Sequence, residues 1–221
     1  MNDKCRIGID VGGTFTDIVA VSDTGTVTFS KAASTPKDPS IGVMNAVERL
    51  ADELGINLET LLSKTESIVH GTTVATNALL ERKGAKTGLL TTLGHRDVLE
   101  MKEGLKDDRY NMRLPAPAPL VPRFLRLGVR ERIKPDGSIH TKLDDASLDE
   151  AINKLREEKV TSVAVCYLHA YKEPKHEQET KKILEARLPG VSVSISSEVF
   201  PEIKEYERVS TTIVNAYVRP I

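Results

Sequence analysis

Tryptophan is absent from this chain, and aromatic residues make up only 4% of its 221 residues. Hydrophobic residues nevertheless reach 39%, which is enough to bury a core at this length. Such a core has to be largely aliphatic. The length allows one large domain or two small ones.

The chain also lacks an apolar run of the ~18 residues that a transmembrane helix needs. Its first ten residues contain no apolar signal core and lead directly into a strand-like segment. Only two cysteines are present, Cys5 and Cys166, and both lie in apolar runs. We therefore expect a cytoplasmic protein with two buried free thiols, no zinc site and no membrane contact.

Neither sign of charge predominates, since 31 basic residues are matched by 32 acidic ones and the formal net charge is −1. Nucleic-acid-binding domains typically have a basic patch or stripe, so this balance argues against a nucleic-acid partner. Both common phosphate-binding fingerprints are missing, namely GxxxxGK followed by Ser or Thr, and GxGxxG. A nucleotide site in this chain would therefore use a different motif.

Such a motif lies in residues 7–21, where two apolar strand-like runs flank a pair of glycines. Asp10 is at the end of the first run, and Gly12, Gly13 and Thr14 form the connection. Glycines let a backbone approach a bulky anion, and successive N–H groups in a tight turn form an anion-binding nest. A carboxylate beside a polyphosphate is tolerated when Mg²⁺ offsets the repulsion. Asp10 is therefore predicted to be a metal-binding residue or a general base.

Because side chains alternate along a strand, the remaining polar residues of this hairpin can be assigned to its two faces. Thr14 and Thr16 fall on one face of the second strand, so both hydroxyls can face the phosphates, whereas Asp17 points to the other face. A third strand is expected at 26–31, after a turn. The alternative interpretation is an ordinary glycine hairpin with an incidental acid.

A second group of polar residues follows a short predicted strand. His70 ends this strand, and Thr72, Thr73 and Asn77 lie at the start of a predicted helix. Ligands of α/β sheets bind at the carboxyl ends of strands, so these residues are candidates for substrate binding, with His70 as a catalytic hydrogen-bonding group. The structural alternatives are a helix cap at Thr72 or Thr73 and burial of His70 in the core, and both remain open.

Arg96 is in a similar position, because it follows the apolar strand predicted at 87–91. A guanidinium there can bind a substrate carboxylate or phosphate. It can equally pair with Asp97 or another neighbour, and the residue types alone do not separate the two roles.

Strand and helix signals alternate through much of the chain, which predicts an α/β fold with a mainly parallel sheet in the second half. The proline-rich stretch 114–122 cannot sustain regular pairing, so residues 102–141 are predicted to be an inserted loop and hairpin between segments 1–101 and 142–221. The hairpin would pair 127–133 with 137–141. Helices are expected at 39–54, 59–63, 74–82, 97–101, 148–155, 173–188 and 203–217, and further strands at 67–70, 87–91, 162–167 and 191–195.

Four segments together indicate a family resemblance. They are 10–17 (DVGGTFTD), 70–84 (HGTTVATNALLERKG), 94–101 (GHRDVLEM) and 205–220 (EYERVSTTIVNAYVRP). Their order and spacing resemble the hydantoinase A, 5-oxoprolinase and acetone carboxylase family over nearly the whole chain. Three consecutive strands with a phosphate loop in the first hairpin also resemble the actin, Hsp70 and sugar-kinase superfamily. The resemblance implies an actin-like (ribonuclease H-like) ATPase domain, with a mixed sheet that opens with a three-stranded meander and is flanked by helices.

The same resemblance implies an activity. Such enzymes use ATP and Mg²⁺ to phosphorylate an amide or ketone oxygen, so that water or bicarbonate can attack. For this chain it implies the N-terminal domain or subunit of an ATP-dependent cyclic amide hydrolase of the hydantoinase or 5-oxoprolinase type. Family members are considerably longer, so we expect a hydantoinase B-type partner subunit, a C-terminal half, or both, and self-association is also open. The alternatives are a subunit of a ketone carboxylase and a non-catalytic binding or assembly module.

Overall fold

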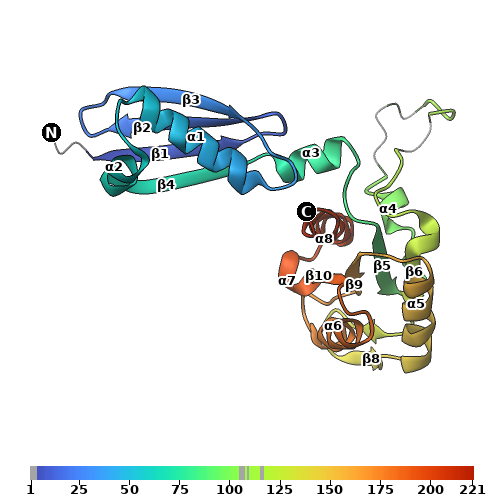
Figure 1. Cartoon of the computed structure of the whole chain (residues 1–221). Helices are drawn as coiled ribbons and strands as arrows, with labels where there is room; N and C mark the ends of the chain where they lie inside the picture. The colour runs from blue at the N-terminus through green and yellow to red at the C-terminus, as the bar shows by residue number, and fades with distance from the viewer. Residues whose placement is uncertain (1–3, 105–107, 109, 115–116) are drawn as a thin grey trace. The chain divides into compact units, whose positions relative to one another are not determined.

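The computed structural model of the chain describes residues 4–104, 108, 110–114 and 117–221. The chain forms two compact units, Met1–Glu81 and Arg82–Ile221, each with a sheet of its own (Figure 1). No helix within the described ranges is long and apolar enough to cross a membrane. The two sheets differ in strand direction and in how their faces are covered.

The first unit opens with three consecutive antiparallel strands, which confirms the predicted meander, and a fourth strand joins β1 in parallel. The resulting order is β3-β2-β1-β4. Side chains alternate along β1, so every second residue is buried and those between are wholly or partly exposed. The four strands are β1 (Cys5–Val11), β2 (Phe15–Ser22), β3 (Val27–Ala33) and β4 (Thr65–Thr72).

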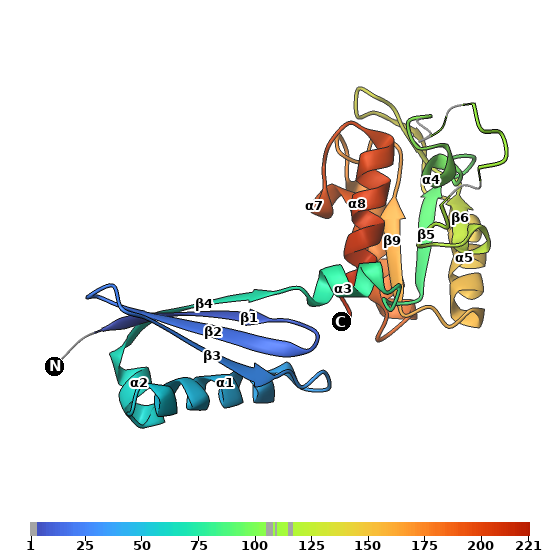
Figure 2. The ribbon, with the colours of Figure 1, turned by 90° about the horizontal axis from the view of Figure 1, so that it is seen from above.

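Two helices, α1 (Pro39–Glu53) and α2 (Leu58–Lys64), cover one face of this sheet (Figure 2). α1 begins where the sequence predicts, because the Asp38 carboxylate accepts a hydrogen bond from the Ser40 N–H at 3.0 Å and proline suits the first helical position. The apolar stripe of α1 packs on the sheet to form an aliphatic core. This core contains Cys5, Ile7, Ile9, Val11, Ile18, Ala20, Ala32, Ala46, Val47, Leu50, Ala51 and Leu61.

No described element of this unit covers the other face of the sheet. Phe29 is 70% exposed there and Val69 is 69% exposed. The same face carries Asp10 and Asp17, which lie opposite each other on β1 and β2. We call it the open face. Beyond β4 the chain enters the short helix α3 (Val74–Leu80).

The second unit is built on four parallel strands in the order β10-β9-β5-β6. Every residue of β5 and β9 is buried, as is typical of a parallel sheet with helices on both faces. Strands β5, β9 and β10 lie within one residue of their predicted bounds. The strands are β5 (Thr87–Thr92), β6 (Arg126–Val129), β9 (Ser162–Cys166) and β10 (Ser192–Ile195).

Helices flank both faces of this sheet. α8 packs against β5, β9 and β10, whereas α5 packs against β6 and α6, and Figure 2 shows α8 and α5 on opposite sides of the strands. Among the buried hydrophobic residues described in this unit, only Tyr167 and Tyr217 are aromatic, in line with the composition. The helices are α4 (Val98–Met101), α5 (Asp145–Glu157), α6 (Lys175–Arg187), α7 (Ser196–Val199) and α8 (Glu205–Val218).

The sequence predicted a hairpin that pairs 127–133 with 137–141. This prediction is wrong for the first strand, because 127–133 is divided between two strands. β6 joins the parallel sheet beside β5, and only β7 (Arg132–Ile133) pairs with β8 (Ile139–Thr141). Pairing with β5 buries Val129 completely, and burial of such a side chain contributes about 1.5–3 kcal/mol. A local hairpin on the surface would leave much of that area exposed.

The border between the units also differs from the predicted boundaries at 101 and 141. It falls after Glu81, because β5 is a central strand that pairs with both β6 and β9. Residues 105–107, 109 and 115–116 of the predicted insertion lie outside the described residues. Two short elements, the 3₁₀ helix at Arg123–Leu125 and α7, were not expected, since three or four residues are too few to show a periodic pattern.

Candidate functional site

The first candidate site is the turn between β1 and β2. The Gly12 N–H donates to the Phe15 carbonyl at 3.0 Å and closes the turn. A Cβ added at Gly12 would lie 3.0 Å from that same carbonyl oxygen, so the close approach favours glycine. Gly13 and Thr14 are exposed, and among the described residues their N–H groups have no hydrogen-bond acceptor. The turn therefore presents free donors to solvent, as an anion-binding nest does.

Ser34, which the sequence analysis overlooked, holds this turn in place. Its hydroxyl donates to the Gly12 carbonyl at 2.8 Å, and its N–H donates to the Thr14 carbonyl at 3.0 Å. The Thr16 hydroxyl lies 3.1 Å from the Ser34 hydroxyl, and Thr16 is completely buried. Thr16 therefore stabilises the turn from inside, and its position does not suit the predicted phosphate contact.

Asp10 lies on the open face of the sheet. Its strand partner Asp17 is paired with Lys31 at 3.0 Å, while no ion pair holds Asp10 among the described residues. A hollow of about 720 Å³ borders these groups. No cluster of three acidic, histidine or cysteine side chains in the described part of the chain could hold a metal by itself. One free carboxylate beside a turn of free N–H groups suits Mg²⁺, which usually takes one or two carboxylates together with waters and substrate phosphates.

The start of α3 lies against this turn. The Thr72 hydroxyl donates to the Val11 carbonyl at 3.2 Å and accepts from the Val74 N–H at 3.2 Å, whereas Thr73, at the N-cap position, forms no side-chain cap. Asn77 Nδ2 lies 3.3 Å from the Thr73 hydroxyl. The same nitrogen is 3.4 Å from where a Cβ at Gly13 would be. The structure thus brings these three predicted polar residues next to the glycine turn.

His70 is separated from Asp10 by the sheet itself. In the parallel register, His70 is the partner of Ile9 and Gly71 is the partner of Asp10, so His70 lies on the face covered by α1. It borders a mainly apolar hollow of about 450 Å³ together with Ile9, Val43 and Val47. The predicted combination of Asp10 and His70 in one catalytic site is therefore not what the structure shows. Strand alternation on β4 decides this, and it depends on a pairing register that the sequence does not reveal.

Comparison with known proteins adds the family. Residues 6–188 match the model of the hydantoinase/oxoprolinase N-terminal region. The chain belongs to this family.

Three relatives cover almost the whole chain. The crystal structure of ATP-dependent caprolactamase from Pseudomonas jessenii is 44% identical, with a TM-score of 0.85 over 97% of this chain and 31% of its own. A nucleotide-free acetone carboxylase, solved in work on ATP-dependent acetone carboxylation, is 28% identical with a TM-score of 0.89 over 99% and 32%. The acetophenone carboxylase gamma subunit of Aromatoleum aromaticum is 38% identical over 96% and 31%. The chain spans about a third of the length of these relatives.

Arg96, another residue of the family motifs, lies in the second unit, in the exposed segment after β5. It does not form the predicted pair with Asp97. That carboxylate is held by Arg123 through two hydrogen bonds, of 2.9 and 3.0 Å. Hydrogen bonding from Arg123 lowers the pKa of Asp97. Arg96 remains exposed and is a proposed contact only.

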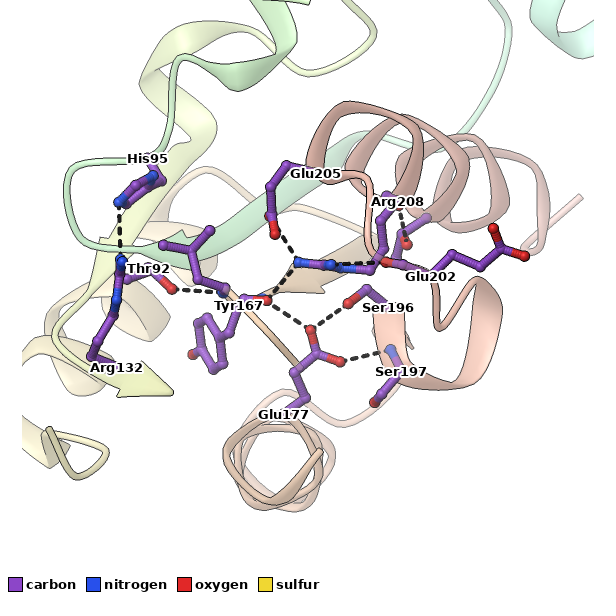
Figure 3. A network of polar contacts seen from close by, with 12 residues as sticks. Thr92, His95, Arg132, Tyr167, Glu177, Ser196, Ser197, Glu202, Glu205 and Arg208 are labelled. Carbon is purple, nitrogen blue, oxygen red and sulfur yellow. Dashed lines mark hydrogen bonds and ion pairs between the residues drawn. The ribbon is translucent and has the colours of Figure 1, made fainter. Parts of the chain in front are cut away.

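The second unit of this hydantoinase/oxoprolinase chain also contains a buried polar network that sequence reasoning missed (Figure 3). Glu177 is fully buried and accepts hydrogen bonds from the Tyr167 N–H, the Ser196 hydroxyl and the Ser197 N–H. Burial raises the pKa of Glu177. Arg208, also fully buried, donates to the Tyr167 carbonyl at 2.9 Å.

A second buried pair lies at the same end of the sheet. The Glu131 carboxylate lies 2.8 Å from His176 Nδ1 and also accepts a hydrogen bond from the Thr92 hydroxyl. Thr92 in turn accepts from the Leu168 N–H at 2.9 Å. Glu131 and His176 look like ordinary surface positions in the sequence, because neither belongs to an apolar run.

Proposed function

We propose that this chain is the N-terminal part of an ATP-dependent enzyme that hydrolyses a cyclic amide, and that its β1–β2 turn holds the ATP phosphates. Family membership, together with 44% identity to an ATP-dependent caprolactamase, carries the proposal. The three-stranded meander and its exposed glycine turn support the finer assignment to the actin-like ATPase fold.

The chemistry explains why a hydrolase would use ATP. An amide carbonyl is a poor electrophile because it is stabilised by resonance. The amide oxygen bonds to the γ-phosphorus of ATP as ADP departs. Water then readily attacks the carbonyl carbon of the phosphorylated amide. Phosphoryl transfer depends mainly on positioning and on charge neutralisation, and a turn of free N–H groups supplies both.

Within this site, Gly12, Gly13 and Thr14 are proposed to contact the phosphates. Asp10 would hold Mg²⁺, which offsets the phosphate charge when bound. Thr72, Thr73 and Asn77 lie beside the turn and are proposed to contact the substrate. The buried Thr16 and the separated His70 are left out.

The rest of the enzyme would come from further protein. Because the chain spans about a third of its relatives, we propose that a hydantoinase B-type subunit, a C-terminal half, or both complete the reaction. The name caprolactamase subunit alpha, given to a relative 44% identical to this chain, supports a multi-subunit enzyme.

A ketone carboxylase is the second candidate. It is supported by 38% identity to an acetophenone carboxylase subunit and by the close superposition on acetone carboxylase. Both candidates would phosphorylate a carbonyl oxygen, so they share the proposed ATP site. In the assembled enzyme, ATP hydrolysis stimulated by a lactam would support the first candidate. Stimulation by a ketone with bicarbonate would support the second.

Calorimetric titration of Mg-ATP into the purified chain tests the phosphate site. Asp10→Asn should weaken binding by at least about tenfold, since a metal-coordinating carboxylate is lost. The matched variant Asp23→Asn, an exposed acid in the β2–β3 turn, should bind as the wild type does. A folded chain that binds no Mg-ATP would contradict a working site in this chain and favour the assembly-module interpretation.

A further inference from the structure

The sheet of the second unit reverses its winding at one point. From β5 the chain passes through α4 to β6 on one side, and from β6 it passes through α5 to β9 on the other side of β5. The segments that leave the carboxyl ends of β5 and β9 therefore diverge. In open α/β sheets, ligands bind outside the carboxyl ends at such a point. Neither the glycine turn nor its neighbours belong to this sheet.

Two histidines and an arginine are among the residues that follow these strands. His95 follows β5, Arg132 follows β6 and His169 follows β9. His95 Nε2 and an Arg132 guanidinium nitrogen lie 3.2 Å apart (Figure 3). His95 is exposed and Arg132 half-buried, so a small molecule can reach both.

Arg132 differs from Arg208, the arginine of the buried network, in its partners. Arg208 has the Glu205 carboxylate at 2.8 Å. Arg132 has no carboxylate partner among the described residues, and its hydrogen bond goes to an imidazole. A half-buried guanidinium is normally matched by an anion, because partial desolvation of an unpaired charge is costly. Its free donors form a planar fork that suits a carboxylate.

The two histidines can add hydrogen bonds. A guanidinium only donates, so His95 Nε2 accepts and the proton of the neutral ring lies on Nδ1. Burial, followed by the charge of Arg132, lowers the pKa of His95, which favours that neutral ring. His169 Nδ1 is buried and has no hydrogen-bond partner in the described part of the chain. His169 also has a φ of +59°, which is uncommon outside glycine and often marks a functional position.

We propose that Arg132, His95 and His169 form a second ligand site, which binds the carboxylate of a small molecule at the carboxyl ends of β5, β6 and β9. The Arg132 guanidinium supplies one positive charge, and the two imidazole rings add hydrogen-bonding nitrogens. That combination matches a singly charged planar anion better than a doubly charged phosphate. This site is independent of the proposed ATP site, and each can fail without the other.

Histidine-ring NMR of the purified chain tests this, with sodium acetate titrated against sodium chloride at constant ionic strength. We expect saturable shifts of the His95 and His169 rings. Arg132→Gln should weaken acetate binding by about tenfold or more, as expected for a charge-assisted hydrogen-bonded pair. Arg130→Gln, an exposed arginine in the same segment, should change it less than about twofold by the same reasoning.

Several outcomes would overturn the proposal. They are the absence of saturable shifts in the wild type, equal weakening in the two arginine variants, and tighter Arg132-dependent binding of inorganic phosphate than of acetate. Should Arg132→Gln fail to fold, His95→Gln serves instead, because His95 is exposed. It removes the Nδ1 donor and should weaken acetate binding at least about threefold, as loss of one hydrogen bond does. Unchanged binding in that variant would also overturn the proposal.

Discussion

The two units build sheets of equal strand number and cover them differently. In the second unit, helices pack on both faces and the central strands are wholly buried, so polar groups gather at the strand ends or inside a satisfied network. In the first unit, helices cover one face only, and Asp10 lies on the open face. The contrast shows two ways to place polar groups, on a sheet face left open or at the strand ends of a sheet covered on both faces.

The largest expected effect tests the buried network of the closed sheet. Arg208→Met removes donors from the Tyr167 and Glu202 carbonyls and should destabilise the second unit by about 3 kcal/mol, because the carbonyl of the buried Tyr167 loses this partner. All five tyrosines lie between Tyr110 and Tyr217, so tyrosine fluorescence during urea unfolding reports on this unit. The control Lys181→Met breaks an exposed pair with Glu198 and should cost less than about 1 kcal/mol. Equal losses would contradict the difference between buried and exposed charge.

A pair of glycines tests packing density. A Cβ at Gly84 would lie 2.0 Å from the Tyr217 ring, whereas a Cβ at Gly71, on the first sheet, would meet only an atom 3.9 Å away. Gly84→Ala should therefore destabilise the second unit by about 1–3 kcal/mol, as overpacking does. Gly71→Ala should leave stability within about 0.5 kcal/mol. Urea unfolding followed by circular dichroism measures both, and a larger loss from Gly71→Ala would reverse the comparison.

A helix cap in the second unit should show a pH dependence. Asp144 caps α5 and accepts a hydrogen bond from the Ser147 N–H at 2.9 Å. This bond lowers the pKa of Asp144 below its ordinary value of 3.8. The contribution of this hydrogen bond to the free energy of unfolding is therefore fully present above the ordinary pKa. It is lost as the pH falls through the pKa of Asp144 in the folded state. Asn is an equally good cap, so Asp144→Asn should keep neutral-pH stability but lose less on acidification. Identical acid sensitivity of the two proteins in urea unfolding would refute this role.

The smallest effect is expected on the open face. Phe29→Ser replaces a side chain that is 70% exposed and should change the stability of the first unit by less than about 0.5 kcal/mol. Hydrogen exchange of the β1–β3 amides measures this unit separately. A loss above about 1.5 kcal/mol would mean that the face is packed in solution, and the contrast between the units would then disappear.

Local patterns predicted most of the elements. The helices expected at 39–54 and 203–217 are present as α1 and α8, and α1 begins at residue 39 as expected. Apolar runs predicted β5 and β9. The same local patterns predicted a single hairpin strand over 127–133, because they do not show that β6 pairs with β5, which is distant in the sequence. Nor could they separate the two units after Glu81, since that border depends on which strands share a sheet.

The candidate sites divide in the same way. The sequence alone determined the glycine turn, the acid that precedes it, the aliphatic core and the family motifs, because each depends on residues close together in the chain or on composition. Only the tertiary structure decided that Thr16 is buried against Ser34, that His70 and Asp10 lie on opposite faces, and that His95 meets Arg132. These relations follow from strand register and from contacts between segments far apart in the chain, and a one-residue change of register would move every side chain of a strand to the other face.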